Sequence, residues 1–160
     1  MRNVLVQTLI AVHVLSALVG IGPTFILHLL LRGNQSAAQL RHSLALQRIV
    51  ERFPKIGGPI AVASGILLVS FYSYGSFGQL WLIGSLVLFI LIQIVVVGVA
   101  GRQLQPVLAW EREAAGQTDP VVPPQVEEAL KRVGGSMWLA HALAAALFLL
   151  MILKPATPLW

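Results

Sequence analysis

Residues 4–31 read VLVQTLIAVHVLSALVGIGPTFILHLLL, an unbroken stretch that contains no Asp, Glu, Lys or Arg. An α-helix needs about 20 predominantly apolar residues to cross roughly 30 Å of hydrocarbon. The stretch is too long for the core of a signal peptide and lacks a small-residue cleavage site. It therefore predicts a membrane-spanning helix and places the chain among integral membrane proteins.

Three further apolar stretches follow, at residues 56–74, 80–101 and 135–153. Each run is continuous and does not alternate with polar residues, so the pattern indicates helices and not the strands of a barrel. We predict an all-α fold, a tight antiparallel four-helix transmembrane bundle, formed by one integral membrane domain over residues 1–160.

The composition agrees with a lipid-embedded chain. Hydrophobic residues make up 57% of the 160 residues and charged residues 11%, whereas a soluble domain has about 25% charged residues. The absence of cysteine excludes disulfides, thiolate metal sites and iron–sulfur clusters. In a soluble protein, the net charge of +5 would suggest that the protein binds nucleic acid. Here most of the basic residues flank apolar spans, so we expect no nucleic-acid partner.

The positions of Lys and Arg predict the orientation of the chain. Nine of these residues lie in the first and third connections, whereas the opposite side has only Arg2 and Lys154. Cytoplasmic segments carry the excess of Lys and Arg, so we predict that both termini lie outside. The nine residues are Arg32, Arg41, Arg48, Arg52, Lys55, Arg102, Arg112, Lys131 and Arg132.

The first connection contains a predicted amphipathic helix. Ser36 and Gln39 have the spacing of a capping box, and apolar residues recur behind them at helical spacing up to Phe53. A basic stripe accompanies them, formed by Arg41, Arg48 and Arg52. We predict that this helix lies on the inner leaflet and that the stripe binds anionic lipid. Docking of a membrane protein partner is the alternative.

Small residues predict how the spans pack. Gly57, Ala61 and Gly65 recur every fourth residue in the second span, and such spacing allows two helix backbones to approach closely. In the first span Gly20 serves the same purpose. Pro23 is expected to kink that helix and to free one backbone carbonyl.

All four spans place a polar side chain near the middle of the membrane. At 1.5 Å per residue, His13 and Ser16 of the first span, Ser64 of the second, Gln93 of the third and His141 of the fourth all lie within a few ångströms of it. Polar groups are costly in lipid and therefore need an explanation.

Two explanations fit these polar groups. Histidines on facing transmembrane helices can hold haem b, because neutral imidazole is a strong iron ligand, and we predict His13 and His141 as axial ligands, although their estimated depths differ by about 9 Å. Alternatively, a hydrogen bond between Gln93 and His141 satisfies both groups without a cofactor. His28 lies near the inner interface, where no special role is expected.

No catalytic constellation is readable in the sequence. The spans contain no carboxylate, which argues against a proton-coupled transporter, and no nucleophile and base recur at a known spacing. Whether the protein is an enzyme stays open. The two functional hypotheses are a haem-b protein in electron transfer or redox sensing, and a cofactor-free accessory or scaffold subunit that docks a partner through its basic surface.

The stretch from His13 to Gly22 (HVLSALVGIG) resembles the first helix of an uncharacterised family of four-helix bacterial membrane proteins. More distantly, it is similar to CopD-type copper-resistance proteins and HemJ-type protoporphyrinogen oxidases. The resemblance covers the whole chain in length, number of spans and orientation. It implies a multi-pass protein of the bacterial inner membrane with haem at His13, and it implies no particular activity. The spans contain no lysine, unlike HemJ-type proteins, and there is no methionine-rich segment.

Overall fold

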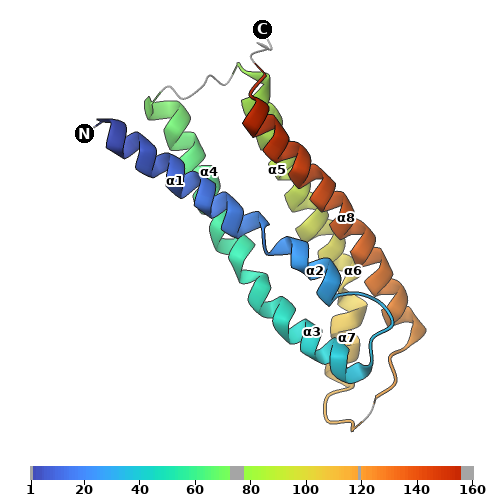
Figure 1. Ribbon diagram of the computed structural model, residues 1–160. Coiled ribbons are helices and arrows are strands. Elements are labelled where there is room, and N and C mark those ends of the chain that lie inside the picture. Colours follow the sequence, from blue (N-terminus) through green and yellow to red (C-terminus); the bar gives the residue numbers. More distant parts are fainter. Residues whose placement is uncertain (1, 73–77, 119, 156–160) are drawn as a thin grey trace.

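The computed structural model describes residues 2–72, 78–118 and 120–155, and its elements there are helices arranged as four long rods (Figure 1). Each rod contains a helix long and apolar enough to cross a membrane. The predicted all-α, four-helix architecture is therefore confirmed. In chain order the elements are α1 (Arg2–Ile21), α2 (Thr24–Leu30), α3 (Ala37–Val50), α4 (Arg52–Tyr72), α5 (Leu80–Gln93), the π-helix η1 (Ile94–Ala100), α6 (Gly101–Gln103), α7 (Gln105–Glu113) and α8 (Pro124–Leu153).

The first rod consists of α1 and α2, the second of α3 and α4, the third of α5, η1, α6 and α7, and the fourth of α8. These rods associate in two pairs. α1 packs along α4, and α5 packs along α8. The pairs diverge toward the end where α1 begins and α8 finishes (Figure 1). They meet at the opposite end, where α2 lies against both α3 and α8. Tight packing, which we predicted for the whole bundle, is thus found within the pairs, and the two pairs join mainly at one end.

Small residues explain why α1 and α4 lie so close. A β-carbon added to Gly57 would lie 2.7 Å from the backbone nitrogen of Gly20 and 2.7 Å from the carbonyl oxygen of Ser16. Only glycine leaves room for backbones at this separation, as the sequence predicted for Gly57 and Gly20. This contact fixes the register of the first two spans.

Pro23 divides the first span as predicted. α1 ends at Ile21 and α2 begins at Thr24, because proline lacks a backbone N–H and its ring clashes with the preceding turn. The carbonyl of Ile21 accepts a hydrogen bond from the Thr24 hydroxyl at 2.6 Å. The kink directs α2 toward α8.

The capping box of α3 is also present. Ser36 Oγ accepts from the Gln39 backbone N–H at 3.3 Å, and Gln39 Oε1 accepts from the Ser36 N–H at 3.1 Å. α3 does not form a separate surface helix, however, because it continues into α4 with only Glu51 between them (Figure 1). Leu40 and Leu44 are fully buried, so the apolar face of α3 packs against protein where we had predicted lipid.

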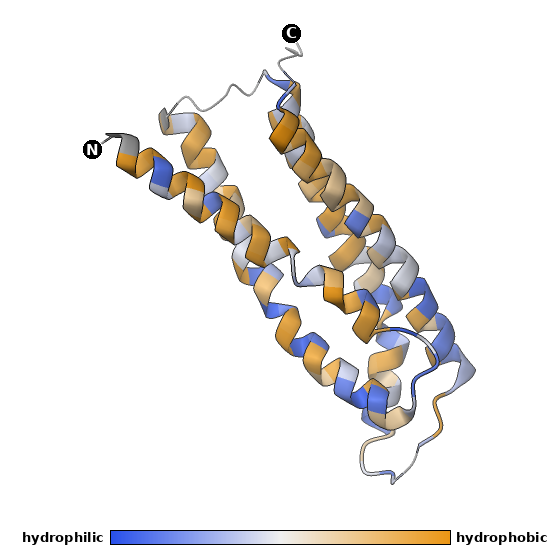
Figure 2. Ribbon diagram, viewed as in Figure 1, coloured by the Kyte–Doolittle hydropathy of each residue, from blue (hydrophilic) through white to orange (hydrophobic). Residues whose placement is uncertain are grey.

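That apolar face belongs to the largest cluster of buried residues. The cluster combines α2, α3, the end of the third rod and the first half of α8; its most enclosed members are Leu40, Leu44, Val107, Leu130 and Val133. Polar residues gather around it at this end, whereas the rest of each rod is largely apolar (Figure 2). We call this the basic end, because α3, α7 and the first turns of α8 lie here and carry Arg41, Arg48, Arg112, Lys131 and Arg132.

Two arginines of the predicted stripe are occupied within the protein. Arg41 donates to the carbonyl of Ala114, and Arg48 forms an ion pair with Glu111 at 2.5 Å. Both contacts join α3 to the end of the third rod. The side chain of Arg52 is exposed. Binding of anionic lipid by the three arginines stays a prediction. Two of the three, Arg41 and Arg48, already have partners within the protein.

Candidate functional site

His13 lies at the interface between α1 and α4. Its Nδ1 is 2.7 Å from the carbonyl oxygen of Ala61, so Nδ1 carries the proton and donates it to this carbonyl. The Nε2 atom is then the nitrogen with the free lone pair. The ring packs over Gly65, where a β-carbon would lie 3.0 Å from His13 Cε1. A small residue and a carbonyl on α4 thus hold the imidazole in one orientation.

The two predicted serines have different surroundings. Ser64 is buried, donates to the Ile60 carbonyl at 2.6 Å and lies 3.3 Å from His13 Nδ1. It therefore lies beside His13, and its role as a supporting polar group stays a prediction. Ser16 donates back to Val12 and His13 carbonyls of its own helix. The Ser16 hydroxyl therefore forms its described hydrogen bonds within α1, and none of them reaches the ring of His13 or α4.

His141 lies in a second cluster, where α8 meets the kinked part of the first span. Its Nε2 is 3.2 Å from the carbonyl oxygen of Thr24. The Phe25 ring stacks on the imidazole at 4.3 Å between centroids, with 8° between the planes. His28 and Trp138 stand edge-on to it at 5.2 and 6.0 Å. The predicted membrane histidine is therefore buried among three other rings.

The structure does not bring His13 and His141 together. His13 and Thr24, whose carbonyl holds His141, are eleven residues apart on one span, which corresponds to roughly 16 Å of helix axis. No described contact links the two imidazoles. Two axial nitrogens of one haem iron must stand on opposite faces of the same macrocycle, so this arrangement does not fit a single iron held by both. Ligation by each histidine separately stays a prediction.

Gln93 is not the partner of His141. The imidazole bonds to the Thr24 carbonyl, whereas Gln93 lines a groove between α4 and α5 together with Phe89 and Gly58. The predicted Gln93–His141 hydrogen bond is therefore wrong. The estimated depths of the two residues were similar, but the kink at Pro23 gives His141 a nearer acceptor.

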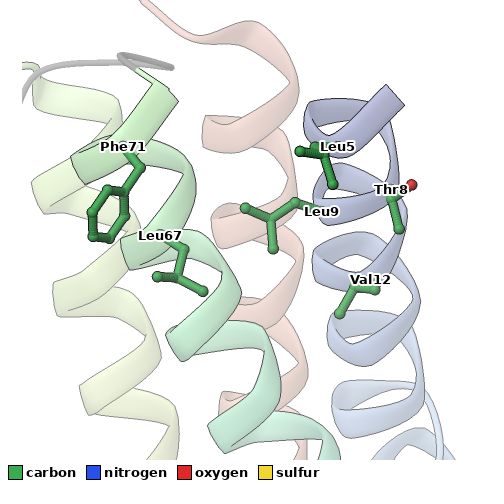
Figure 3. Close-up of a pocket in the computed structure, with 6 residues that line it drawn as sticks. All are labelled: Leu5, Thr8, Leu9, Val12, Leu67 and Phe71. Atoms are coloured by element: carbon green, nitrogen blue, oxygen red, sulfur yellow. The ribbon is translucent and has the colours of Figure 1, made fainter. Parts of the chain in front are cut away.

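An apolar hollow of about 370 Å³ adjoins the His13 site on the side toward the chain's N-terminus. Figure 3 shows its lining, which consists of Leu5, Thr8, Leu9 and Val12 from α1 and Leu67 and Phe71 from α4. Val12 directly precedes His13, and Leu9 is one helical turn away. The hollow has no charged side chain in its lining, and His13 is a sequence neighbour of its lining without being part of it.

Comparison with known proteins gives one assignment. A family model described as "Predicted integral membrane protein (DUF2269)" matches residues 7–155. The chain belongs to this family. No curated protein and no solved structure matches the chain. The match confirms an integral membrane protein of an uncharacterised family, as we predicted, and the four candidate spans make it a multi-pass protein.

No group of three or more His, Cys, Asp or Glu side chains that could hold a metal ion occurs among the described residues of this DUF2269 member. Haem differs from a bare metal ion in that one or two imidazoles and apolar contact are enough to hold it.

Sequence reasoning missed the ring cluster around His141. Phe25, His28 and Trp138 were not identified as its neighbours, although Pro23 signalled that the first span bends. The direction of a kink depends on which neighbouring helix the second segment packs against. Nothing in the order of residues 20–24 specifies that α8 is that neighbour.

Proposed function

We propose that this DUF2269 protein binds haem b through His13 and acts in membrane electron transfer or redox sensing. The observation that carries the proposal is the 2.7 Å contact between His13 Nδ1 and the Ala61 carbonyl. Histidines that ligate metals usually donate their other N–H to a carbonyl or carboxylate, which fixes the tautomer and makes the ligating nitrogen more basic. His13 has this partner on a neighbouring helix, and Ser64 stands beside it.

The surroundings of His13 support the same proposal. The hollow that begins at the neighbouring Val12 is lined by Thr8 and five apolar side chains of the same two helices, and the macrocycle of a haem needs surroundings that are mainly apolar. The absence of a side chain at Gly65 admits the imidazole itself, because a β-carbon there would lie 3.0 Å from His13 Cε1. When bound, haem would supply one-electron chemistry at its iron. The chain's own contribution would be to hold the imidazole, fix its tautomer and keep the surroundings apolar.

His141 is the second predicted ligand and the less favourable one. Its Nε2 faces the Thr24 carbonyl, and Phe25, His28 and Trp138 surround the ring. An iron would have to bind Nδ1 inside a cluster that is already filled by side chains. The proposal therefore places the iron on His13 and leaves His141 as a packing residue.

The test is the absorption spectrum of the purified protein with haem supplied during expression. We expect a Soret band that shifts on reduction. His13→Ala should abolish the band or change the spin state, because the axial bond is lost. His141→Ala should keep it, and so should the control His42→Ala, which removes an exposed imidazole of α3.

A colourless wild type, or a Soret band that survives His13→Ala unchanged, contradicts the proposal. Loss of the band only in His141→Ala would move the site to the ring cluster. Helical content, measured by circular dichroism, separates loss of haem from loss of folding.

The alternative is a cofactor-free accessory subunit, and the basic end favours it. α3, α7 and the start of α8 form a packed extension of the bundle, with exposed Arg102, Arg112 and Lys131. Such a surface suits a partner with an acidic face. A colourless protein that gives one discrete cross-linked species in membranes, lost when Arg102 and Arg112 are changed to Gln, would support this function instead.

A further inference from the structure

A second hollow lies between the two helix pairs, on the face where α4 passes α5. It has a volume of about 490 Å³ and is lined by one side of α4 from Pro54 to Ile66 and by Phe89 and Gln93 of α5. Phe89 packs toward Gly58, where a β-carbon would lie 3.7 Å from its ring. The groove therefore lies between the two helix pairs, and in a bilayer its open side would face lipid.

The groove has a polar end and an apolar end. Lys55 lies at the basic end of the lining. Gln93 is one turn beyond Phe89 in the same direction, and no hydrogen bond of its amide occurs within the described residues. Farther along α4, Val62, Ala63 and Ile66 supply only hydrocarbon. Small side chains at Gly58 and Ala63 keep the groove open.

Two features of the backbone add to the polarity of the polar end of the groove. Pro59 has no N–H, so the carbonyl of Lys55 lacks its usual partner within the helix. On the other wall, the π-helix η1 begins directly after Gln93. π-helical turns in α-helical rods are concentrated at functional sites, because the extra residue redirects a side chain.

We infer that this groove binds an anionic glycerophospholipid from the leaflet at the basic end. Its phosphate would lie at Lys55, its glycerol hydroxyls near the Gln93 amide and the free carbonyl, and one acyl chain along Val62, Ala63 and Ile66. Basic pockets between transmembrane helices are known to bind such headgroups. Glu51 pairs with Lys55 at 2.9 Å, but Arg52 beside it leaves one net positive charge at the mouth of the groove.

This inference differs from lipid binding by the arginine stripe. Arg41 and Arg48 are held by Ala114 and Glu111, so they are poor candidates for a lipid site. Lys55, by contrast, has both an exposed side chain and a largely apolar groove beside its stem. The structure thus points to a defined groove and not to a surface stripe.

Native mass spectrometry of the delipidated full-length protein tests the site with dioleoyl phosphatidylglycerol and dioleoyl phosphatidylcholine. We expect phosphatidylglycerol to bind several-fold more tightly. Lys55→Gln should reduce that affinity about fivefold, in keeping with roughly 1 kcal/mol per basic residue at a lipid surface. Lys131→Gln, at an exposed lysine of α8, is the control. Equal binding of the two lipids, or equal effects of the two lysine variants, would overturn the inference.

A separate variant tests whether the apolar end of the groove holds the acyl chain. Ala63→Trp should fill the groove and weaken both lipids, whereas Ala142→Trp, at an exposed alanine of α8, should not. A photoactivatable phosphatidylglycerol with its reactive group on the acyl chain provides a test on the unaltered protein. Adducts should map to residues 55–66 or 89–93. Adducts spread evenly over the apolar surfaces of all four rods would show that the lipid has no preferred groove.

Discussion

Gly57 of α4 lies against Gly20 of α1 so closely that neither position has room for a side chain. A β-carbon at Gly57 would be 2.7 Å from the Gly20 nitrogen, and one at Gly20 would be 2.9 Å from the nitrogen of Gly58. In both cases the obstacle is backbone, which cannot turn aside as a flexible side chain can. The two spans are therefore held at one separation and in one register.

This contact predicts a difference between two adjacent glycines. Gly57→Ala should lower the free energy of unfolding by about 1–3 kcal/mol, the usual cost of overpacking. Gly58→Ala is the control, because its β-carbon would meet only the Phe89 ring at an ordinary 3.7 Å. Both changes have the same effect on helix propensity. Unfolding in mixed micelles measures the two variants, and equal stabilities would mean that α1 and α4 are farther apart than described.

The buried face of α3 gives a second prediction. Leu44→Ala should cost about 2–5 kcal/mol of stability, as for a large side chain removed from a packed core. Ile49→Ala on the same helix should cost much less, because Ile49 is 55% exposed. A helix lying on the lipid surface would give similar values at both positions, so the pair distinguishes the two placements of α3.

The kink predicts an effect of one hydroxyl group. Thr24→Val keeps the shape of the side chain but removes the hydrogen bond to the Ile21 carbonyl. Such bonds contribute about 0.6 kcal/mol on average in membrane bundles, up to about 1.7. Thr8→Val is the matched control, since Thr8 bonds to Val4 within an unbroken helix. A stability loss at position 8 as large as that at position 24 would disagree with the described kink.

The His13 site can be perturbed without touching the histidine. In haem-loaded protein, Gly65→Ala should shift the Soret band or the reduction potential, because the new β-carbon would lie 3.0 Å from His13 Cε1. Gly84→Ala introduces similar crowding against Leu150 in the other helix pair and should leave the spectrum unchanged. Identical spectra for wild type and both variants would place the iron elsewhere.

The orientation can be measured directly with reporter fusions. Fusions after Gly33 and Thr118 should report the cytoplasm, and one after Gly75, which lies outside the described residues, should report the exterior. The basis is the nine-to-two distribution of Lys and Arg. An external report at Gly33 would reverse the orientation and assign the lipid groove to the other leaflet.

Hydropathy and small-residue spacing predicted much of the fold. The apolar stretches identified the four rods, and the spacing of Gly57, Ala61 and Gly65 predicted a face of α4 that packs closely on another helix, although not that α1 is this helix. These features are local in the sequence, or depend on close contact that few residues allow. The capping box of Ser36 and Gln39 could also be predicted, because its two residues are only three positions apart in the sequence.

What the sequence did not predict depends on relations between distant segments. An amphipathic helix has the same pattern whether its apolar face meets lipid or protein, so the burial of Leu40 and Leu44 could not be read. The depth of His141 was estimated from straight helices, and the bend at Pro23 changed which groups stand beside it. The position of His13 within the first apolar stretch could be read from the sequence, but its bond to Ala61 required knowledge of the α1–α4 register.

The pairing of rods also implies an order of assembly. Span one finds its partner in span two, and span three in span four, so each hairpin can close as soon as it leaves the ribosome. The buried cluster that joins the hairpins takes Leu130 and Val133 from the last rod. The junction is therefore completed only when the last rod has been made, and a chain truncated before α8 should leave the apolar faces of α3 and α7 partly uncovered at the basic end.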